Sequence, residues 1–331
     1  MANSKLKLLY ILELLYNESD EEHPIDTERI LLYLRNHSIE CERKSIYSDI
    51  TVLKEFGLDI LLSKGASGGY FLASREFEVA EIRLLCDAVQ AAGFISPKKS
   101  RHLIDKILTL VSAPQARQIK SQVYVDNRPK SANEEIYYHI DKLNRAIQNG
   151  WQVQALYRRR KITDQNAVEY DDRLHTVSPY AMIWADDHYY LVCNKAKYDN
   201  LMVLRIDRIK KLEILENERA RHFSEVSPYK NSFDSADYAK RHLHMFSGTP
   251  EGVELICQND LLEQVLDRFG EDVRLYRAGE DKFGLRTQAA VNDGLVAWIM
   301  QFGAKVRVKK PDSLKKLLFE KAREIESVYK I

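Results

Sequence analysis

The sequence has few cysteines, almost no net charge and no long apolar run. Its four cysteines (Cys41, Cys86, Cys193 and Cys257) lie far apart without a C-x-x-C pair, which argues against a disulfide framework or a structural zinc site. Lys and Arg number 50 against 49 Asp and Glu, so the formal net charge is +1. This balance excludes a polycationic coat but permits a local basic patch. Neither a membrane span nor a signal-peptide pattern is present, so we expect a cytoplasmic protein without a membrane partner.

Motifs typical of enzymes are also missing. Gly65-x-Ser67-x-Gly69 matches the G-x-S-x-G pattern of a hydrolase, but that pattern needs a helix directly after the serine. Here Tyr70-Phe-Leu follows, so the glycines predict the tip of a β-hairpin. No stretch has the glycine pattern and following helix that a phosphate loop or a dinucleotide-binding site needs. We therefore expect no catalytic residue, metal or cofactor.

Residues 1–76 predict three helices followed by a hairpin. Leu8, Ile11 and Leu15 recur at helical spacing, Asp26 can cap a second helix, and a third helix ends at Gly57. This order predicts a winged helix-turn-helix, with double-stranded DNA as the partner. The candidate DNA-binding residues lie on the third helix, opposite its apolar positions, and in the hairpin turn: Arg43, Lys44, Ser45, Tyr47, Ser48, Thr51, Lys54 and Lys64.

The charge of residues 1–76 leaves an alternative open: the polar face of the third helix is simply exposed to water and binds nothing. Acidic residues outnumber basic ones in residues 1–76, although many acids gather between Glu18 and Glu28. We therefore expect weak non-specific binding and a modest salt dependence, with tight binding by a homodimer on paired half-sites.

The rest of the chain predicts a connector and two further domains. Residues 77–132 read as a helical connector, and residues 133–220 as a helix followed by short strands that suggest a small barrel. Residues 221–331 comprise a linker and a strand-helix-strand-strand-helix-strand order typical of a ferredoxin-like domain. Basic residues interleave with tyrosines in the strand-rich region, as suits an anionic ligand with stackable rings, such as a nucleotide. An equally supported alternative is a barrel whose tyrosines pack inside it, while its arginines are exposed to solvent or paired with acidic side chains.

Two stretches carry a family resemblance. "CERKSIYSDITVL" resembles the recognition helix of bacterial transcription factors of the WYL family, with Glu42 and Ser48 departing from the usual pattern. "SPYAMIWADDHYYLVCNK" with "LRIDRI" resembles the core of a WYL domain, although Tyr189 stands where the family has tryptophan. The C-terminal part resembles the WCX extension, with Trp298 in a matching place.

This resemblance implies an α+β multidomain protein with a winged helix-turn-helix, a helical connector, an Sm-like β-barrel and a ferredoxin-like C-terminal domain. It implies a ligand-responsive transcriptional regulator whose effector is a nucleotide or single-stranded nucleic acid. Arg205 and Arg208, three residues apart, share a site only if the chain bends near Asp207. The candidate ligand-binding residues are Arg158, His175, Tyr180, Tyr190, Arg205 and Arg208. The alternative function is a non-catalytic accessory or scaffold protein that binds nucleic acid.

Overall fold

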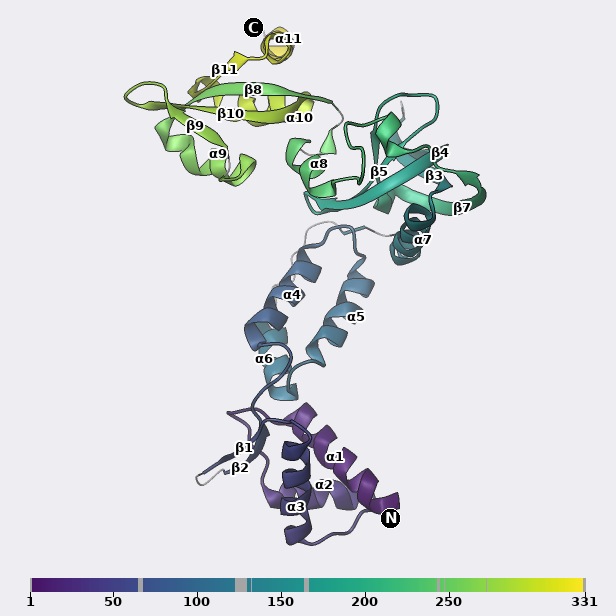
Figure 1. Cartoon of the computed structure of the whole chain (residues 1–331), viewed down its shortest axis with the longest axis vertical. Coiled ribbons are helices and arrows are strands. Elements are labelled where there is room, and N and C mark those ends of the chain that lie inside the picture. The colour runs from purple at the N-terminus through teal and green to yellow at the C-terminus, as the bar shows by residue number, and fades with distance from the viewer. Residues whose placement is uncertain are drawn as a thin grey trace. The chain divides into compact units, whose positions relative to one another are not determined.

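The computed structural model describes residues 2–64, 68–122, 130–131, 133–163, 167–242, 245–246, 248–271 and 273–329. It divides into two compact units, Met1–Glu134 and Glu135–Ile331, each treated by itself below (Figure 1). The chain has the mixed α and β multidomain composition that the sequence predicts.

Three helices and a hairpin open the first unit. They are α1 (Ala2–Glu18), α2 (Thr27–Asn36), α3 (Arg43–Glu55), β1 (Ile60–Ser63) and β2 (Gly69–Leu72). As predicted, the Asp26 carboxylate caps α2 by accepting a hydrogen bond from the Arg29 backbone N–H at 2.7 Å. Ile46, Ile50 and Leu53 bury one face of α3 against the core, and Gly57 at φ +107° ends the helix.

The hairpin is fixed to the helices through its second strand. β1 and β2 pair antiparallel, from Ile60 opposite Leu72 to Ser63 opposite Gly69. Ile25 and Tyr70 exchange two backbone hydrogen bonds, both 2.8 Å long. A side chain at Gly69 would meet the Ile25 backbone at 2.4 Å, so this close approach requires glycine. The expected hairpin is confirmed, while its tip at Gly65 to Ser67 lies outside the described residues.

The other helices of this unit have a core of their own. They are α4 (Val79–Ala91), α5 (Pro97–Leu108) and α6 (Ala113–Gln122), in the region where the sequence predicts helices. Ile82, Cys86, Ile104, Leu108 and Ile119 pack together between them. Most of the linker predicted at 126–133 lies outside the described residues.

The second unit begins with a helix and a five-stranded antiparallel sheet. Helix α7 (Ile136–Asn149) packs against β3 (Trp151–Ile162), β4 (Val168–Ala185) and β7 (Ile209–Arg219). Strands β5 (His188–Asn194) and β6 (Met202–Arg205) complete the order β6-β5-β4-β3-β7. Alternating apolar residues such as Val153, Ala155 and Leu191 form the buried side of the strands.

The expected closed barrel is not found among the described strands. β6 and β7 are the edges of this sheet, with no ladder between them in the described part of the chain. β6 has only four residues, and a 3₁₀ turn over Ile206–Arg208 directs the chain away before β7 begins. A bulge between Pro179 and Ala181 bends β4, as bulges do.

A second sheet forms the C-terminal part of this unit, after α8 (Ser235–Arg241). Its elements are β8 (Thr249–Gln258), α9 (Leu262–Phe269), β9 (Arg274–Arg277), β10 (Lys282–Val291), α10 (Asp293–Met300), β11 (Val306–Lys310) and α11 (Asp312–Tyr329). The strands are antiparallel in the order β11-β8-β10-β9, and one core joins them to the three helices. The order of elements is the predicted one; the ferredoxin-like classification stays a prediction.

Candidate nucleic-acid interface and effector site

Helix α3 presents a polar face away from the core of the first unit. Because Ile46, Ile50 and Leu53 point inward, the residues between them face outward. Lys44, Tyr47, Ser48, Thr51 and Lys54 are exposed, and Tyr47 is 46% exposed. This face carries hydroxyl, phenol and ammonium groups, all of which can bind phosphate or base edges.

Three of the candidate DNA-binding residues are already engaged within the protein. Ser45 accepts a hydrogen bond from the buried Lys7 ammonium, which also contacts Asp49 at 2.8 Å between Nζ and Oδ2. The Thr51 hydroxyl donates to the Tyr47 carbonyl at 2.9 Å, and the exposed Arg43 pairs with Glu28 at 3.1 Å. Ser45 therefore anchors α3 to α1.

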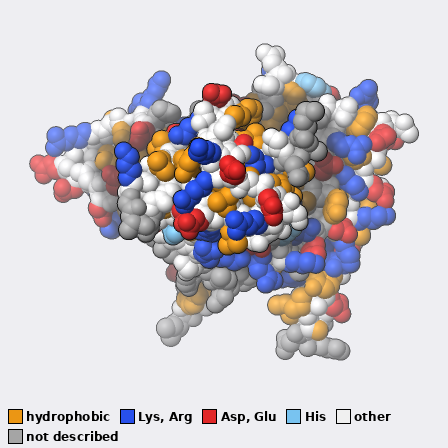
Figure 2. Space-filling model, turned by 90° about the horizontal axis from the view of Figure 1, so that it is seen from below, with side chains coloured by type: hydrophobic (Ala, Val, Ile, Leu, Met, Phe, Trp, Pro, Cys, Tyr) orange, Lys and Arg blue, Asp and Glu red, His pale blue; other side chains and the backbone are white. Residues whose placement is uncertain are grey.

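The lysines are the available cations of this surface. Lys44, Lys54 and Lys64 are exposed, and none forms an ion pair with a residue that the structure describes. Figure 2 shows Lys and Arg side chains interspersed with acidic and hydrophobic ones across the face in view. The three exposed lysines suit a binding surface with few phosphate contacts.

In the second unit, a cationic cluster forms where β6 ends. Arg205 lies directly opposite Tyr190 in the ladder of β5 and β6, so their side chains share one face. Arg205 forms an ion pair with Asp207, and the 3₁₀ turn bends the chain at Asp207. The bend that the sequence required near Asp207 is therefore present, and Arg208 is exposed just after it.

His188 joins this cluster, although the sequence-based candidates omitted it. Its position two residues before Tyr190 places both side chains on the same face of β5, and their rings lie 6.2 Å apart edge to face. Burial lowers the pKa of His188, and the charges of Arg205 and Arg208 lower it further. Its Nδ1 is buried and has no hydrogen-bond partner among the described residues. The two-residue spacing was the signal that could have found it.

The other candidate ligand-binding residues have separate surroundings. Arg158 forms a two-bond fork with Asp172, at 2.8 and 2.7 Å, and lies over the Tyr170 ring on the β3–β4 hairpin. His175 packs edge to face on Tyr157, and neither of its ring nitrogens finds a partner among the described residues. Burial lowers the pKa of His175.

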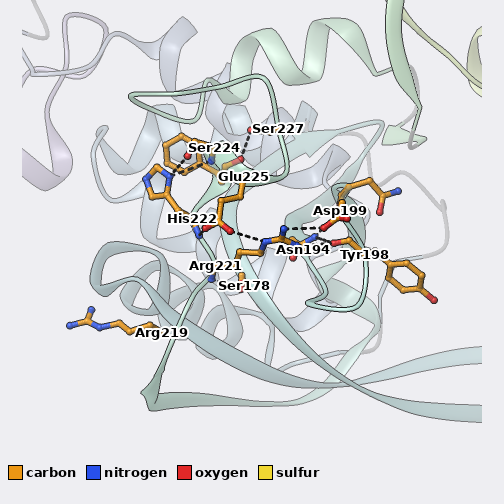
Figure 3. Close-up of polar contacts among 12 residues, drawn as sticks. Ser178, Asn194, Tyr198, Asp199, Arg219, Arg221, His222, Ser224, Glu225 and Ser227 are labelled. Carbon is orange, nitrogen blue, oxygen red and sulfur yellow. Dashed lines mark hydrogen bonds and ion pairs between the residues drawn. The ribbon is translucent and has the colours of Figure 1, made fainter.

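Tyr180 belongs to the core that fixes the segment after β7. Its hydroxyl donates to the Arg221 carbonyl at 2.9 Å, and burial raises the pKa of Tyr180 to about 12. The Arg221 side chain in turn pairs with Asp199 and Glu225, as Figure 3 shows. The Tyr180 ring, in contact with Phe223 and Phe233, serves packing.

The described residues contain neither a cluster of metal ligands nor a membrane-spanning helix. No group of three His, Cys, Asp or Glu residues could hold a metal ion there. None of the helices described combines the length and hydropathy that crossing a bilayer requires.

Two regions of the chain match known domain families. The WYL domain model matches residues 138–214, and the WCX domain model matches residues 249–325. This chain contains a WYL domain and a WCX domain. Its WYL domain contains β3 to β6 with the cluster around Arg205, and its WCX domain contains the second sheet.

Two individual proteins resemble this chain at low sequence identity. A Bacillus subtilis (strain 168) protein named "Uncharacterized HTH-type transcriptional regulator YobV" is 20% identical over 301 residues, which cover 88% of this chain and 90% of the relative. The solved structure of proteasome accessory factor B/C of Arthrobacter aurescens is 14% identical, with a TM-score of 0.28. The match covers 96% of this chain but 46% of that structure, so the chain spans under half its length.

Proposed function

We propose that this WYL-domain protein is a ligand-responsive, DNA-binding transcriptional regulator. The observation that carries the proposal is the exposed polar face of α3 beside a hairpin, in a chain that also holds a WYL domain. The Bacillus subtilis relative, named as a transcriptional regulator of the helix-turn-helix type, supports it. The domains proposed are a winged helix-turn-helix at 1–76, a helical connector at 77–132, a WYL sensor at 133–220, and a linker with the WCX domain at 221–331.

On this proposal, α3 enters the major groove of an operator. Lys44, Lys54 and Lys64 contact phosphates, while Tyr47 and Ser48 reach toward base edges. Few cations are available on one copy, so a homodimer on two half-sites would supply the affinity.

The proposed effector is a nucleotide or a short single strand bound at the cluster of Arg205, Arg208, Tyr190 and His188. Arg208 is exposed beside the half-buried Tyr190 ring, which offers a phosphate partner next to an aromatic surface. The effector changes DNA affinity if it favours one of two arrangements of the protein.

The test is fluorescence anisotropy with the duplex upstream of the protein's own gene, measured with and without a short oligothymidylate. We expect specific binding that the oligothymidylate changes. The Arg208→Ala variant should bind DNA normally and lose the response, whereas Lys210→Ala, an exposed lysine nearby, should keep it. The Tyr47→Ala variant should show the reverse pattern, with weak DNA binding.

Absence of any preference for the upstream duplex over a random one would reject the regulator. A protein that still bound nucleic acid without preference would then fit the alternative, an accessory or scaffold protein.

A further inference from the structure

One face of the WCX sheet lies opposite the core that the domain's three helices share, and it carries charged side chains, with Lys240 of α8 beside it. The inward residues Val253, Leu255 and Leu285 pack with all three helices of the domain in one core. Residues that alternate with them, Glu254 on β8 and Arg286 on β10, therefore point to the opposite face. Figure 1 shows β8 and β10 running side by side in this sheet.

The charged residues form a single row across all four strands. Lys310 on β11 lies opposite Glu254 on β8, Glu254 lies opposite Arg286 on β10, and Arg286 lies opposite Arg274 on β9. With strands about 4.8 Å apart, the row extends roughly 14 Å. Three cations thus share one row with a single carboxylate.

One oxygen of the Glu254 carboxylate is shared by three neighbours. Its Oε1 accepts hydrogen bonds from Tyr276 at 2.6 Å, Lys309 at 2.9 Å and Arg286 at 3.3 Å. These three donors lower the pKa of Glu254 to about 2, so it is ionised at neutral pH. Glu254 therefore fixes the network in place by pairing with Arg286 and Lys309, whereas Arg274 and Lys310 form no ion pair with it in the described structure.

Glycine at position 284 allows this network to form. The Tyr276 ring lies across β10 at Gly284, where a Cβ atom would stand 2.1 Å from the Tyr276 Cζ. Any larger residue there would push the ring away from Glu254. Arg286 also lies over this ring, 5.2 Å from its centroid.

Beside the row is a hollow of about 720 Å³, lined by Arg274, Arg286, Lys310, Lys240 and Glu254 together with uncharged residues that include Thr287 and Gln288. Arg274 and Lys310 are exposed, and neither forms an ion pair with a described residue. The hollow has the size of pockets that hold small organic ligands.

The opposed arginines indicate the charge of the occupant. Like charges directly opposite each other in a sheet destabilise it, yet Arg274 and Arg286 occupy such a pair. An anion between them would remove the repulsion. Guanidinium groups match phosphate oxygens through paired hydrogen bonds, and the length of the row gives a second phosphate a partner at Lys310.

We propose that this row on the WCX sheet is a second anion site, which binds a ligand carrying at least two phosphate groups. The phosphates come either from a free polyphosphate compound, such as a nucleoside triphosphate, or from a nucleic-acid strand. The site goes beyond the effector site proposed at Arg208 and uses none of its residues.

The test measures binding of inorganic tripolyphosphate and of a short oligothymidylate to the full chain by isothermal titration calorimetry. The decisive variant is Arg274→Gln, and its matched control is Arg277→Gln, which removes an exposed arginine from the same strand outside the hollow. We expect the affinity for tripolyphosphate to fall about tenfold or more in Arg274→Gln, and to stay unchanged in Arg277→Gln.

The two probes separate the sources of phosphate. Tripolyphosphate binding that depends on Arg274 supports a free compound, and oligothymidylate binding alone with the same dependence supports a strand. Equal binding by both variants, or no binding of either probe to the unaltered protein, overturns the proposal. Binding lost in Arg208→Ala but kept in Arg274→Gln would assign the ligand to the WYL domain and overturn it too.

Discussion

Arg205 donates two hydrogen bonds to Asp207, from Nε to Oδ1 at 3.0 Å and from Nη2 to Oδ2 at 2.7 Å. Both side chains are largely buried, with 23% and 9% of their surfaces exposed. A planar guanidinium that meets a carboxylate two residues later holds the turn between β6 and β7 in one shape. Arg208, the other arginine of the segment, is thereby presented to solvent at a defined place.

This pair predicts unequal roles for the two arginines. Arg205→Ala leaves Asp207 without its forked partner, and we expect the free energy of unfolding to fall by about 2 kcal/mol. Arg208→Ala should change it by less than about 0.5 kcal/mol, because its side chain is exposed. Urea denaturation followed by circular dichroism measures both. Equally small losses would contradict a structural role for Arg205. Equally large losses would contradict the unequal roles and make Arg208→Ala unsuitable as an effector variant.

Lys7 should be needed to hold α3 in place. It is 9% exposed and joins α1 to α3 through Ser45 and Asp49. Lys7→Met keeps much of the side-chain volume but leaves the Asp49 carboxylate without its cation, so we expect a loss of about 1–3 kcal/mol. Lys5→Met, at an exposed position on the same helix, is the control. Thermal unfolding of both variants decides the point, and matching midpoints would show that the contact does not stabilise α3.

The three helices and the hairpin at the start of the chain were predictable from the sequence because their signals are local. Ile46, Ile50 and Leu53 fix the buried face of α3 by spacing alone, and Asp26 caps α2 where a capping residue was expected. The engagement of Ser45 was not predictable, because Lys7 is 38 residues away in the sequence.

In the sheets, too, features set by neighbouring residues were predictable, and features set by contacts between distant residues were not. Strand positions follow from alternation, but the open edges at β6 and β7 depend on the 3₁₀ turn and on pairing between distant strands. The row from Arg274 to Lys310 appears only once four strands are in register. Likewise, Tyr180 reads as a ligand residue in sequence, and its burial beside Phe223 and Phe233 is set by a segment after the sheet.

The lysines of α3 should account for part of the salt dependence of DNA binding. Each lysine that neutralises one phosphate contributes about 0.9 to the slope of log affinity against log salt concentration. Lys54→Ala should therefore weaken binding to specific and random duplexes alike and lower the slope by about 1. Lys98→Ala, which removes an exposed lysine on α5, should leave the slope unchanged. Anisotropy titrations at several salt concentrations give both slopes, and identical slopes in the two variants would exclude Lys54 from the phosphate contacts.

Glu254 should make the free energy of unfolding of the WCX domain depend on pH in the acidic range. Its donors Tyr276, Lys309 and Arg286 lower its pKa from 4.5 to about 2. The unfolded chain therefore binds a proton at higher pH than the folded chain does, and stability is lost as the pH falls. The contribution of Glu254 is fully present above pH 4.5 and disappears as the pH falls toward 2.

Replacement by glutamine removes this dependence, because an amide carries no charge at any pH in that range. We expect Glu254→Gln to be less stable than the unaltered protein at pH 7, with a difference that shrinks between pH 4.5 and pH 2. Glu263→Gln, on the exposed side of α9, should stay close to the unaltered protein throughout. Urea denaturation across this pH range measures the difference. A constant deficit for Glu254→Gln would mean that the carboxylate contributes through its shape and hydrogen bonds alone, and that its charge is not what holds Lys309 and Arg286 in the row.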